Sequence, residues 1–179
     1  MQIAGLTRNL SLCPINENLY IAAFILFGDV ELCEASAAAL LKKAPEFDVI
    51  LTPEAKSIPL AYAMARQSGK PYIVARKNEK LYMEEITRVE VQSITTEKRQ
   101  MLCIGKHERA QMEGKRVLIV DDVISTGESL RAVEALLQVA GGKRAGAAAV
   151  LAEGDAAERD DILFLEKLPL FNGKGEPLS

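Results

Sequence analysis

The chain has 179 residues, which corresponds to about one domain at roughly 150 residues per domain. Hydrophobic residues make up 49% and charged residues 26% of the chain, so it is globular rather than disordered. With 22 Lys and Arg against 25 Asp and Glu, the net charge is −3. This charge argues against a general nucleic-acid binder but leaves room for a small basic site that faces one anionic ligand.

The chain shows no membrane or export signal. Its longest apolar run, Leu19–Phe27, is far shorter than the roughly 20 residues that a membrane-spanning helix needs. No basic segment followed by an apolar one begins the chain, so we expect no signal peptide. Three widely spaced cysteines without a CxxC pair are typical of a reduced, cytoplasmic protein, and burial of the thiols is a simpler reading than a metal cluster.

Short apolar runs alternate with helical patterns along the chain. In chain order, the predicted elements are a strand over Leu19–Phe27, a helix over Val30–Lys43 with Asp29 as its N-cap, a strand over Val49–Thr52, a helix over Ser57–Ser68, a strand over Pro71–Arg76, two β-rich stretches over Ile86–Thr95 and Gln100–Ile104, a strand over Arg116–Val120, a helix over Ser129–Ala140, and strands over Arg144–Ala152 and Ile162–Glu166. Runs such as Val117–Val120 are apolar on both faces, which suits parallel strands covered by helices on both sides. The order predicts an open α/β sheet, mostly parallel and flanked by helices.

Two segments depart from this alternation. Residues 1–28 precede the first strand–helix unit, and residues 84–113 have the pattern of a hairpin-like β-rich insertion rather than a helix. Both have the character of additions to one α/β core, so we expect a single domain over residues 1–179.

The most informative segment runs from Val117 to Leu130. An apolar strand leads into Asp121 and Asp122, and a hydroxyl-rich turn containing Gly127 then opens a helix. Ligands of open α/β sheets bind at the carboxyl ends of strands, and backbone N–H groups at a helix N-terminus form a phosphate cradle. Two carboxylates beside a phosphate suit a ligand that also has hydroxyls or a divalent cation, as a sugar phosphate with a 2,3-diol does. The alternative is an ordinary turn with a helix cap.

This string closely resembles the phosphoribosyl pyrophosphate motif of type I phosphoribosyltransferases. The resemblance implies that Asp121 and Asp122 bind the ribose 2- and 3-hydroxyls. The residues that it assigns to the 5-phosphate are Ser125, Thr126, Gly127, Glu128 and Ser129. It also implies the type I phosphoribosyltransferase fold, with a small N-terminal hood (residues 1–28) and a flexible β-rich loop (residues 84–113). It further implies a homodimer, and Mg²⁺ that is bound mainly through the pyrophosphate donor.

Two further loops resemble those of adenine phosphoribosyltransferases. Thr52–Leu60 resembles their pyrophosphate loop, with Lys56–Ser57 where Arg–Gly is usual. The residues that this likeness places at the substrate are Glu54, Ala55, Lys56 and Ser57. The cations that follow the next strand, and that the likeness assigns to the donor pyrophosphate, are Arg76, Lys77 and Lys80. An ordinary turn and a solvated basic loop are the alternatives.

The segment Ile25–Val30 resembles the hood of the adenine enzymes, although Gly28 stands where Arg is usual. The resemblance makes Phe27 the ring that stacks on a purine and Leu26 a backbone contact, with core packing of Phe27 as the alternative. In the 84–113 insertion the family's Glu–Tyr–Gly–Thr–Asp-like string is absent, and Glu97 is the nearest acid that could transfer a proton. His107 is better explained as a solvated loop residue than as a general base.

The sequence therefore predicts a purine phosphoribosyltransferase of purine salvage, with adenine favoured as the base. The reaction would join the base to phosphoribosyl pyrophosphate, giving a nucleoside monophosphate and pyrophosphate. Two alternatives stay open, a xanthine- or guanine-type enzyme and a non-catalytic regulator that senses the donor. A receiver-type phosphoacceptor module is disfavoured because the Ser125–Ser129 turn directly follows the acids.

Overall fold

The structure is a computed structural model that describes residues 1–92 and 99–178. Its elements are β1 (Gln2–Ile3), β2 (Leu6–Thr7), β3 (Ser11–Asn16), β4 (Leu19–Ala23), α1 (Val30–Leu41), β5 (Val49–Pro53), α2 (Ile58–Ser68), β6 (Tyr72–Ala75), β7 (Thr87–Gln92), β8 (Arg99–Ile104), α3 (Lys106–Met112), β9 (Arg116–Ile124), α4 (Glu128–Val139), β10 (Lys143–Glu153), η1 (Gly154–Glu158, a 3₁₀ helix) and β11 (Leu163–Leu168). The Asp29 side chain accepts a hydrogen bond from the Leu32 N–H at 3.0 Å, which confirms Asp29 as the N-cap of α1.

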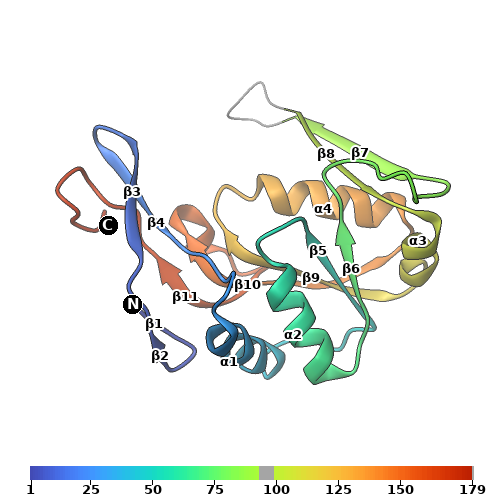
Figure 1. Cartoon of the computed structure of the whole chain (residues 1–179), viewed down its shortest axis with the longest axis horizontal. Helices are drawn as coiled ribbons and strands as arrows, with labels where there is room; N and C mark the ends of the chain where they lie inside the picture. The colour runs from blue at the N-terminus through green and yellow to red at the C-terminus, as the bar shows by residue number, and fades with distance from the viewer. Residues whose placement is uncertain (93–98, 179) are drawn as a thin grey trace.

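One five-stranded sheet forms the centre of the molecule (Figure 1). Its strand order is β11–β10–β9–β5–β6, and all four pairings are parallel. Because parallel strands end at the same edge of a sheet, the loops after β5, β6, β9 and β10 gather there. The predicted open α/β sheet is confirmed.

Helices cover both faces of this sheet. Met64 of α2 packs with Leu118 and Val120 of β9 on one face, while Leu136 of α4 packs with Ile119 on the other. Successive residues of β9 therefore enter different cores, which explains why this strand is apolar on both faces. Among the described residues, no helix is long and apolar enough to cross a membrane.

The insertion after β6 is an antiparallel hairpin, β7–β8, that lies along α4 (Figure 1). Its second strand is joined to the end of β6 by two backbone hydrogen bonds between Arg76 and Cys103, with N···O distances of 2.9 and 2.8 Å. The predicted hairpin is thus confirmed for its described part.

The expectation of no helix within residues 84–113 is wrong, because α3 follows the hairpin. The Glu108 carboxylate accepts a hydrogen bond from the Gly105 N–H at 3.1 Å, and Met112 is fully buried at the other end of α3. These two contacts hold a short helix that periodicity over seven residues does not reveal. His107 consequently lies in the first turn of an exposed helix and not in a loop.

The N-terminal region contains two small hairpins, β1–β2 and β3–β4. The strand predicted over Leu19–Phe27 ends at Ala23, because the chain then turns and the Leu26 carbonyl accepts a hydrogen bond from the Asp29 N–H at 3.1 Å. The backbone of Tyr20 exchanges two hydrogen bonds with that of Phe171, at 2.8 and 2.9 Å. Strand β4 is therefore held by a segment from near the other end of the described chain.

Strand β9 is longer than predicted. The sequence places its end at Val120, but it continues through both acids to Ile124, because β10 stays paired with it as far as the Ala152–Ile124 position. Asp121 and Asp122 therefore belong to a rigid central strand rather than to the loop that follows it.

Candidate active site

Asp121 and Asp122 lie side by side at the carboxyl end of β9. One Asp121 oxygen accepts a hydrogen bond from the Asp122 N–H at 2.9 Å, and the other accepts one from the Ser129 hydroxyl at 3.3 Å. Asp122 is buried, and its Oδ2 atom has no hydrogen-bond partner among the described residues. A buried acceptor without a protein partner is energetically unfavourable, so this oxygen is available to a hydrogen-bond donor or a cation.

The two carboxylates influence each other's protonation. Burial, followed by the negative charge of Asp122, raises the pKa of Asp121 well above the ordinary value for an aspartate. Two acids held this close store electrostatic repulsion that a hydroxyl-bearing or cationic ligand relieves. Such strongly shifted groups are typical of functional sites.

The turn after β9 opens α4 as the sequence predicts. Gly127 has φ of +76° and is the N-cap, a left-handed conformation that favours glycine, and α4 begins at Glu128. The Thr126 hydroxyl oxygen lies 3.5 Å from the Glu128 nitrogen. The first turn of α4 thus lies beside the acids, since its Ser129 hydroxyl reaches Asp121. Free N–H groups at such a helix N-terminus bind phosphate in other α/β proteins.

Arg159, which follows η1, also reaches this turn. A Cβ atom on Gly127 would lie 2.9 Å from its Nη1 atom. The other side of the guanidinium binds the Asp161 carboxylate in two hydrogen bonds of 2.8 and 2.7 Å, and this contact raises the pKa of Arg159. A cation therefore lies against the phosphate-type turn, supplied by a segment that the sequence interpretation did not single out.

The loop after β5 is anchored to β9 by buried hydrogen bonds. The Thr52 hydroxyl lies 2.8 Å from the Val120 carbonyl oxygen and 2.7 Å from the Ser57 hydroxyl, which in turn lies 3.1 Å from the Pro53 carbonyl oxygen. These buried contacts fix the loop, whose Glu54–Ala55 peptide bond is cis. The Lys56 side chain between these anchors is exposed.

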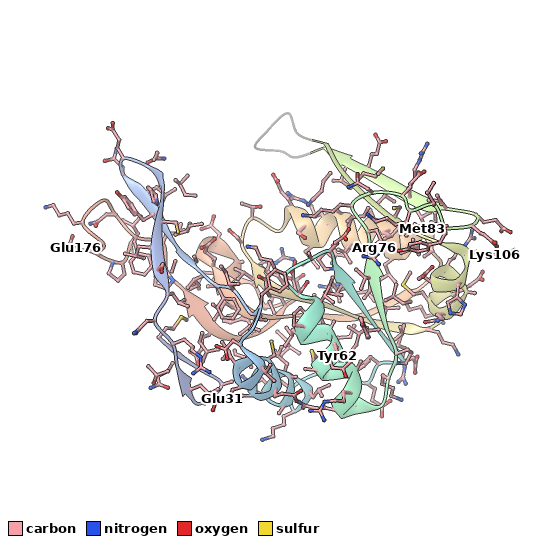
Figure 2. All side chains as sticks on the ribbon, viewed as in Figure 1. Glu31, Tyr62, Arg76, Met83, Lys106 and Glu176 are labelled. Carbon is pink, nitrogen blue, oxygen red and sulfur yellow. The ribbon has the colours of Figure 1, made fainter. Side chains whose placement is uncertain are left out.

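Arg76 and Glu54 form an ion pair between the loops after β6 and β5, with Nη1 and Oε1 3.1 Å apart. The other Glu54 oxygen accepts the Lys77 N–H at 3.0 Å, and this hydrogen bond and Arg76 together lower the pKa of Glu54. Figure 2 shows Arg76 at the end of β6, where its Nη2 atom also lies 3.2 Å from the Tyr82 hydroxyl. The Glu54 carboxylate thus occupies the anion-binding face of the guanidinium.

A cavity of about 250 Å³, called the donor cavity after the ligand that the sequence resemblance predicts for its residues, lies between these loops. Its lining residues are Pro53, Glu54, Ala55, Lys56, Ser57, Lys77, Gln100, Asp121, Asp122, Val123 and Ser129. The structure therefore brings the acid pair, the β5 loop and one of the three predicted β6 cations to one place. Arg76 and Lys80 are not among the lining residues, and Arg76 is paired with Glu54, which does line the cavity.

A second cavity of about 290 Å³, called the base cavity after the role proposed for it below, adjoins the donor cavity and shares Lys56, Asp122 and Val123 with it. Its other lining residues are Ile21, Ala22, Ala23, Phe24, Ile25, Ser125, Glu153 and Leu168. One wall is thus apolar and comes from the N-terminal hairpin and the turn after it. Two larger grooves, of about 730 and 520 Å³, contain none of the predicted site residues.

The two predicted hood contacts lie elsewhere. Leu26 is 1% exposed and Phe27 is 54% exposed, and neither lines either cavity. Phe24 and Ile25 line the base cavity in their place, because β4 ends early and the chain turns at Leu26. The alternative that Phe27 is a core residue is wrong.

The two loop candidates have different outcomes. Glu97 lies outside the described residues. His107 lines a separate groove of about 420 Å³, where its Nε2 atom is 2.7 Å from the side-chain nitrogen of Gln111. This groove shares no lining residue with the donor cavity.

The lining residues that the sequence interpretation missed include Val123, Gln100 and Glu153. Val123 directly follows the acids and could have been found from the spacing of the motif. Gln100 on β8 and Glu153 at the end of β10 carry no local signal, because they reach the cavities only through strand pairing.

Comparisons with known proteins show the family of the chain. The family described as "Phosphoribosyl transferase domain" matches residues 30–174. An adenine phosphoribosyltransferase from Thermotoga sp. (strain RQ2) is 36% identical over 98 residues, which are 55% of this chain and 55% of the relative. The chain thus spans about half the length of the Thermotoga relatives that it matches.

Two further similarities cover more of the chain. A hypoxanthine/guanine phosphoribosyltransferase from Methanocella paludicola is 32% identical over 149 residues, 83% of this chain and 72% of the relative. The crystal structure of adenine phosphoribosyltransferase from Thermoanaerobacter pseudethanolicus superposes with a TM-score of 0.68 at 26% identity, covering 80% of this chain and 84% of that one. The predicted fold is confirmed, and the chain belongs to the phosphoribosyl transferase domain family.

Proposed function

We propose that the protein transfers the 5-phosphoribosyl group of phosphoribosyl pyrophosphate to a ring nitrogen of a purine, with adenine favoured. The products would be a nucleoside monophosphate and pyrophosphate. The observation that carries this proposal is the pair of adjoining cavities that share Asp122, Lys56 and Val123. One is polar and charged, as a sugar pyrophosphate requires, and the other has the apolar wall that a flat base requires.

The donor would be held by groups on three loops. Asp121 and Asp122 would accept hydrogen bonds from the ribose hydroxyls, which would satisfy the unpartnered Asp122 oxygen. The turn of residues 125–129 and the N-terminus of α4 would bind the 5-phosphate. Lys56 and Lys77, both on the donor cavity, would attract the pyrophosphate and stabilise the negative charge that it gains as it leaves C1.

Magnesium fits this site through the donor rather than through a protein cage. Carboxylate oxygens suit Mg²⁺, and the acid pair offers them, but the described residues include no group of three or more His, Cys, Asp or Glu side chains that could hold the ion alone. When bound, Mg²⁺ would neutralise charge on the pyrophosphate.

The predicted roles of the remaining candidates form part of the proposal. Phe27 would stack on the base after a rearrangement of its exposed ring, and Leu26 would offer its backbone. Glu97 would transfer the proton that the base loses. Arg76 would bind the pyrophosphate once Glu54 releases it, and Lys80 would add positive charge nearby.

We also propose a homodimer in the cytoplasm. The exposed apolar side chains of Val30 and Tyr62 would be covered by a second copy. Three free thiols fit a reducing compartment. Light scattering of the purified protein tests the dimer, and a monomer at micromolar concentration would contradict it.

An assay with four bases tests the proposed function. The protein, Mg²⁺ and donor are mixed separately with adenine, guanine, hypoxanthine and xanthine, and the nucleotide formed is measured by chromatography. We expect one clear preference, because a site that hydrogen-bonds one base edge rejects the others strongly. Turnover of an oxopurine alone would contradict the adenine assignment, and donor binding without turnover of any purine would indicate a sensor.

A further inference from the structure

Glu153 is the last residue of β10 and lines the base cavity. Strand β10 lies beside β9, with Leu151 opposite Val123, so Glu153 follows the sheet to the same edge as the acid pair. The residue is half-buried. A carboxylate is therefore placed at the cavity that the proposed function assigns to the base.

The Glu153 carboxylate has no structural task in the described part of the chain. It is the N-cap residue of η1, but its side chain makes no capping hydrogen bond. No ion pair or side-chain hydrogen bond joins it to another described residue, whereas nearby Glu158 pairs with Lys167. A half-buried carboxylate that is left unpaired beside a cavity is available to a ligand.

The other residues of the base cavity limit the kinds of ligand group that Glu153 can bind. The other polar side chains on the base cavity are Lys56, Asp122 and Ser125, all of which belong to the donor-binding loops. The remainder of the wall is apolar, from residues 21–25 and Leu168. Glu153 is thus the one polar side chain of the base cavity that does not belong to a proposed donor-binding loop.

A glutamate carboxylate accepts hydrogen bonds and donates none. At position 6 of a purine, an amino group donates a hydrogen bond, whereas an oxo group offers only lone pairs, which a carboxylate repels. We propose that Glu153 is a specificity-determining residue that accepts a hydrogen bond from the amino group of the base and selects 6-aminopurines over 6-oxopurines. This inference rests on the proposed function.

The test compares adenine with hypoxanthine, which carries an oxo group in place of the 6-amino group. The wild type should have a kcat/KM for adenine at least about tenfold above that for hypoxanthine. In Glu153→Gln the ratio should fall at least about tenfold, because an amide can turn to donate to an oxo group. Glu153→Lys, which only donates, should reverse the preference.

Asp155→Asn is the matched control. It removes the same charge two residues further along, but Asp155 is exposed and lines a different groove. This variant should keep the wild-type ratio. Calorimetry of AMP and IMP binding gives a readout without turnover, and the preference for AMP should change in the same order across the variants.

The outcomes separate this inference from the proposed function. A wild type that transfers purines while Glu153→Gln keeps the same ratio would overturn the role of Glu153 alone. A wild type that prefers hypoxanthine to adenine would also overturn the role of Glu153, before any variant is measured. A wild type that transfers no purine and binds neither nucleotide would overturn the proposed function and this inference together.

Discussion

The donor cavity and the base cavity meet at Asp122, yet they are built in different ways. The donor cavity is formed largely by two short continuous strings, residues 53–57 and residues 121–129, each at the end of a central strand. The base cavity combines residues 21–25 with Glu153 and Leu168, which lie far apart in the chain. Under the proposed function, recognition of the sugar phosphate would be local in sequence, whereas recognition of the base would depend on how distant segments pack.

The largest effect should come from the residues on the donor side. We expect the double variant Asp121→Asn, Asp122→Asn to lose donor binding by about 1.5–3 kcal/mol for each residue, because each change replaces a charged acceptor of a hydroxyl. Calorimetry with phosphoribosyl pyrophosphate measures the loss. Asp160→Asn, at an exposed position outside both cavities, is the control, and equal affinities in the two variants would contradict the donor site.

The phosphate turn should show the next largest effect. In Gly127→Ala the new Cβ would meet Arg159 Nη1 at 2.9 Å, in addition to the penalty of about 1–2 kcal/mol for the left-handed conformation. Binding of ribose 5-phosphate should weaken at least about tenfold because the turn and Arg159 shift together.

The control for this turn is Gly69→Ala. Gly69 also has a positive φ, of +69°, but nothing lies within 4 Å of its Cβ position. Both variants should lose similar stability in thermal unfolding, and only Gly127→Ala should lose phosphate binding. Normal binding in a folded Gly127→Ala protein would show that the turn is only a helix cap.

The acid pair should reduce stability as the pH rises. Burial and Asp122 raise the pKa of Asp121 to about 7 in the folded chain, from an ordinary value of 3.8. The folded chain therefore holds this proton more tightly than the unfolded chain does. The bound proton stabilises the folded chain fully below the ordinary aspartate pKa, and this stabilisation is lost as the pH rises through about 7. We expect Asp121→Asn to raise Tm more at pH 8 than at pH 5, while it weakens donor binding. A Tm difference that does not change with pH would contradict the raised pKa.

The smallest effect concerns the exposed ring on the base side. Phe27→Ala should raise the KM for the base more than the KM for the donor, by about 1 kcal/mol of lost stacking, and leave Tm unchanged because the ring is 54% exposed. Val139→Ala, which truncates a side chain that is also 54% exposed, at the end of α4 and outside both cavities, is the control and should change neither KM. Equal effects on the KM values of both substrates would contradict the proposal that Phe27 binds the base.

The same division between local sequence and contacts of distant segments determines how much of the structure the sequence could predict. The apolar run before Asp121 and the hydroxyl-rich turn after Asp122 carry the strand, the turn and α4 within a few residues of each other, and the structure has all three. The strand nevertheless runs on to Ile124, because its length is determined by pairing with β10 and not by its own residues.

The pairing of Arg76 could not be predicted from its own segment. Three cations in five residues suggested a concentrated anion site, but the nearest anion is Glu54 on another loop. The early end of β4 has a similar cause, since the turn at Leu26 and the contact of Tyr20 with Phe171 decide where the extended chain stops. Such features depend on contacts between segments that are separated in the chain.

The hydrogen bonds between Tyr20 and Phe171 impose an order on the biosynthesis of the protein. A ribosome that adds about 5–20 residues per second needs roughly 8–30 s to extend the chain from Tyr20 to Phe171. Throughout this time β4 has an edge that its final partner has not yet covered, and uncovered edges pair readily with other chains. The hairpin wall of the base cavity therefore gains its last strand partner late in synthesis, and until then its open edge can pair with other chains.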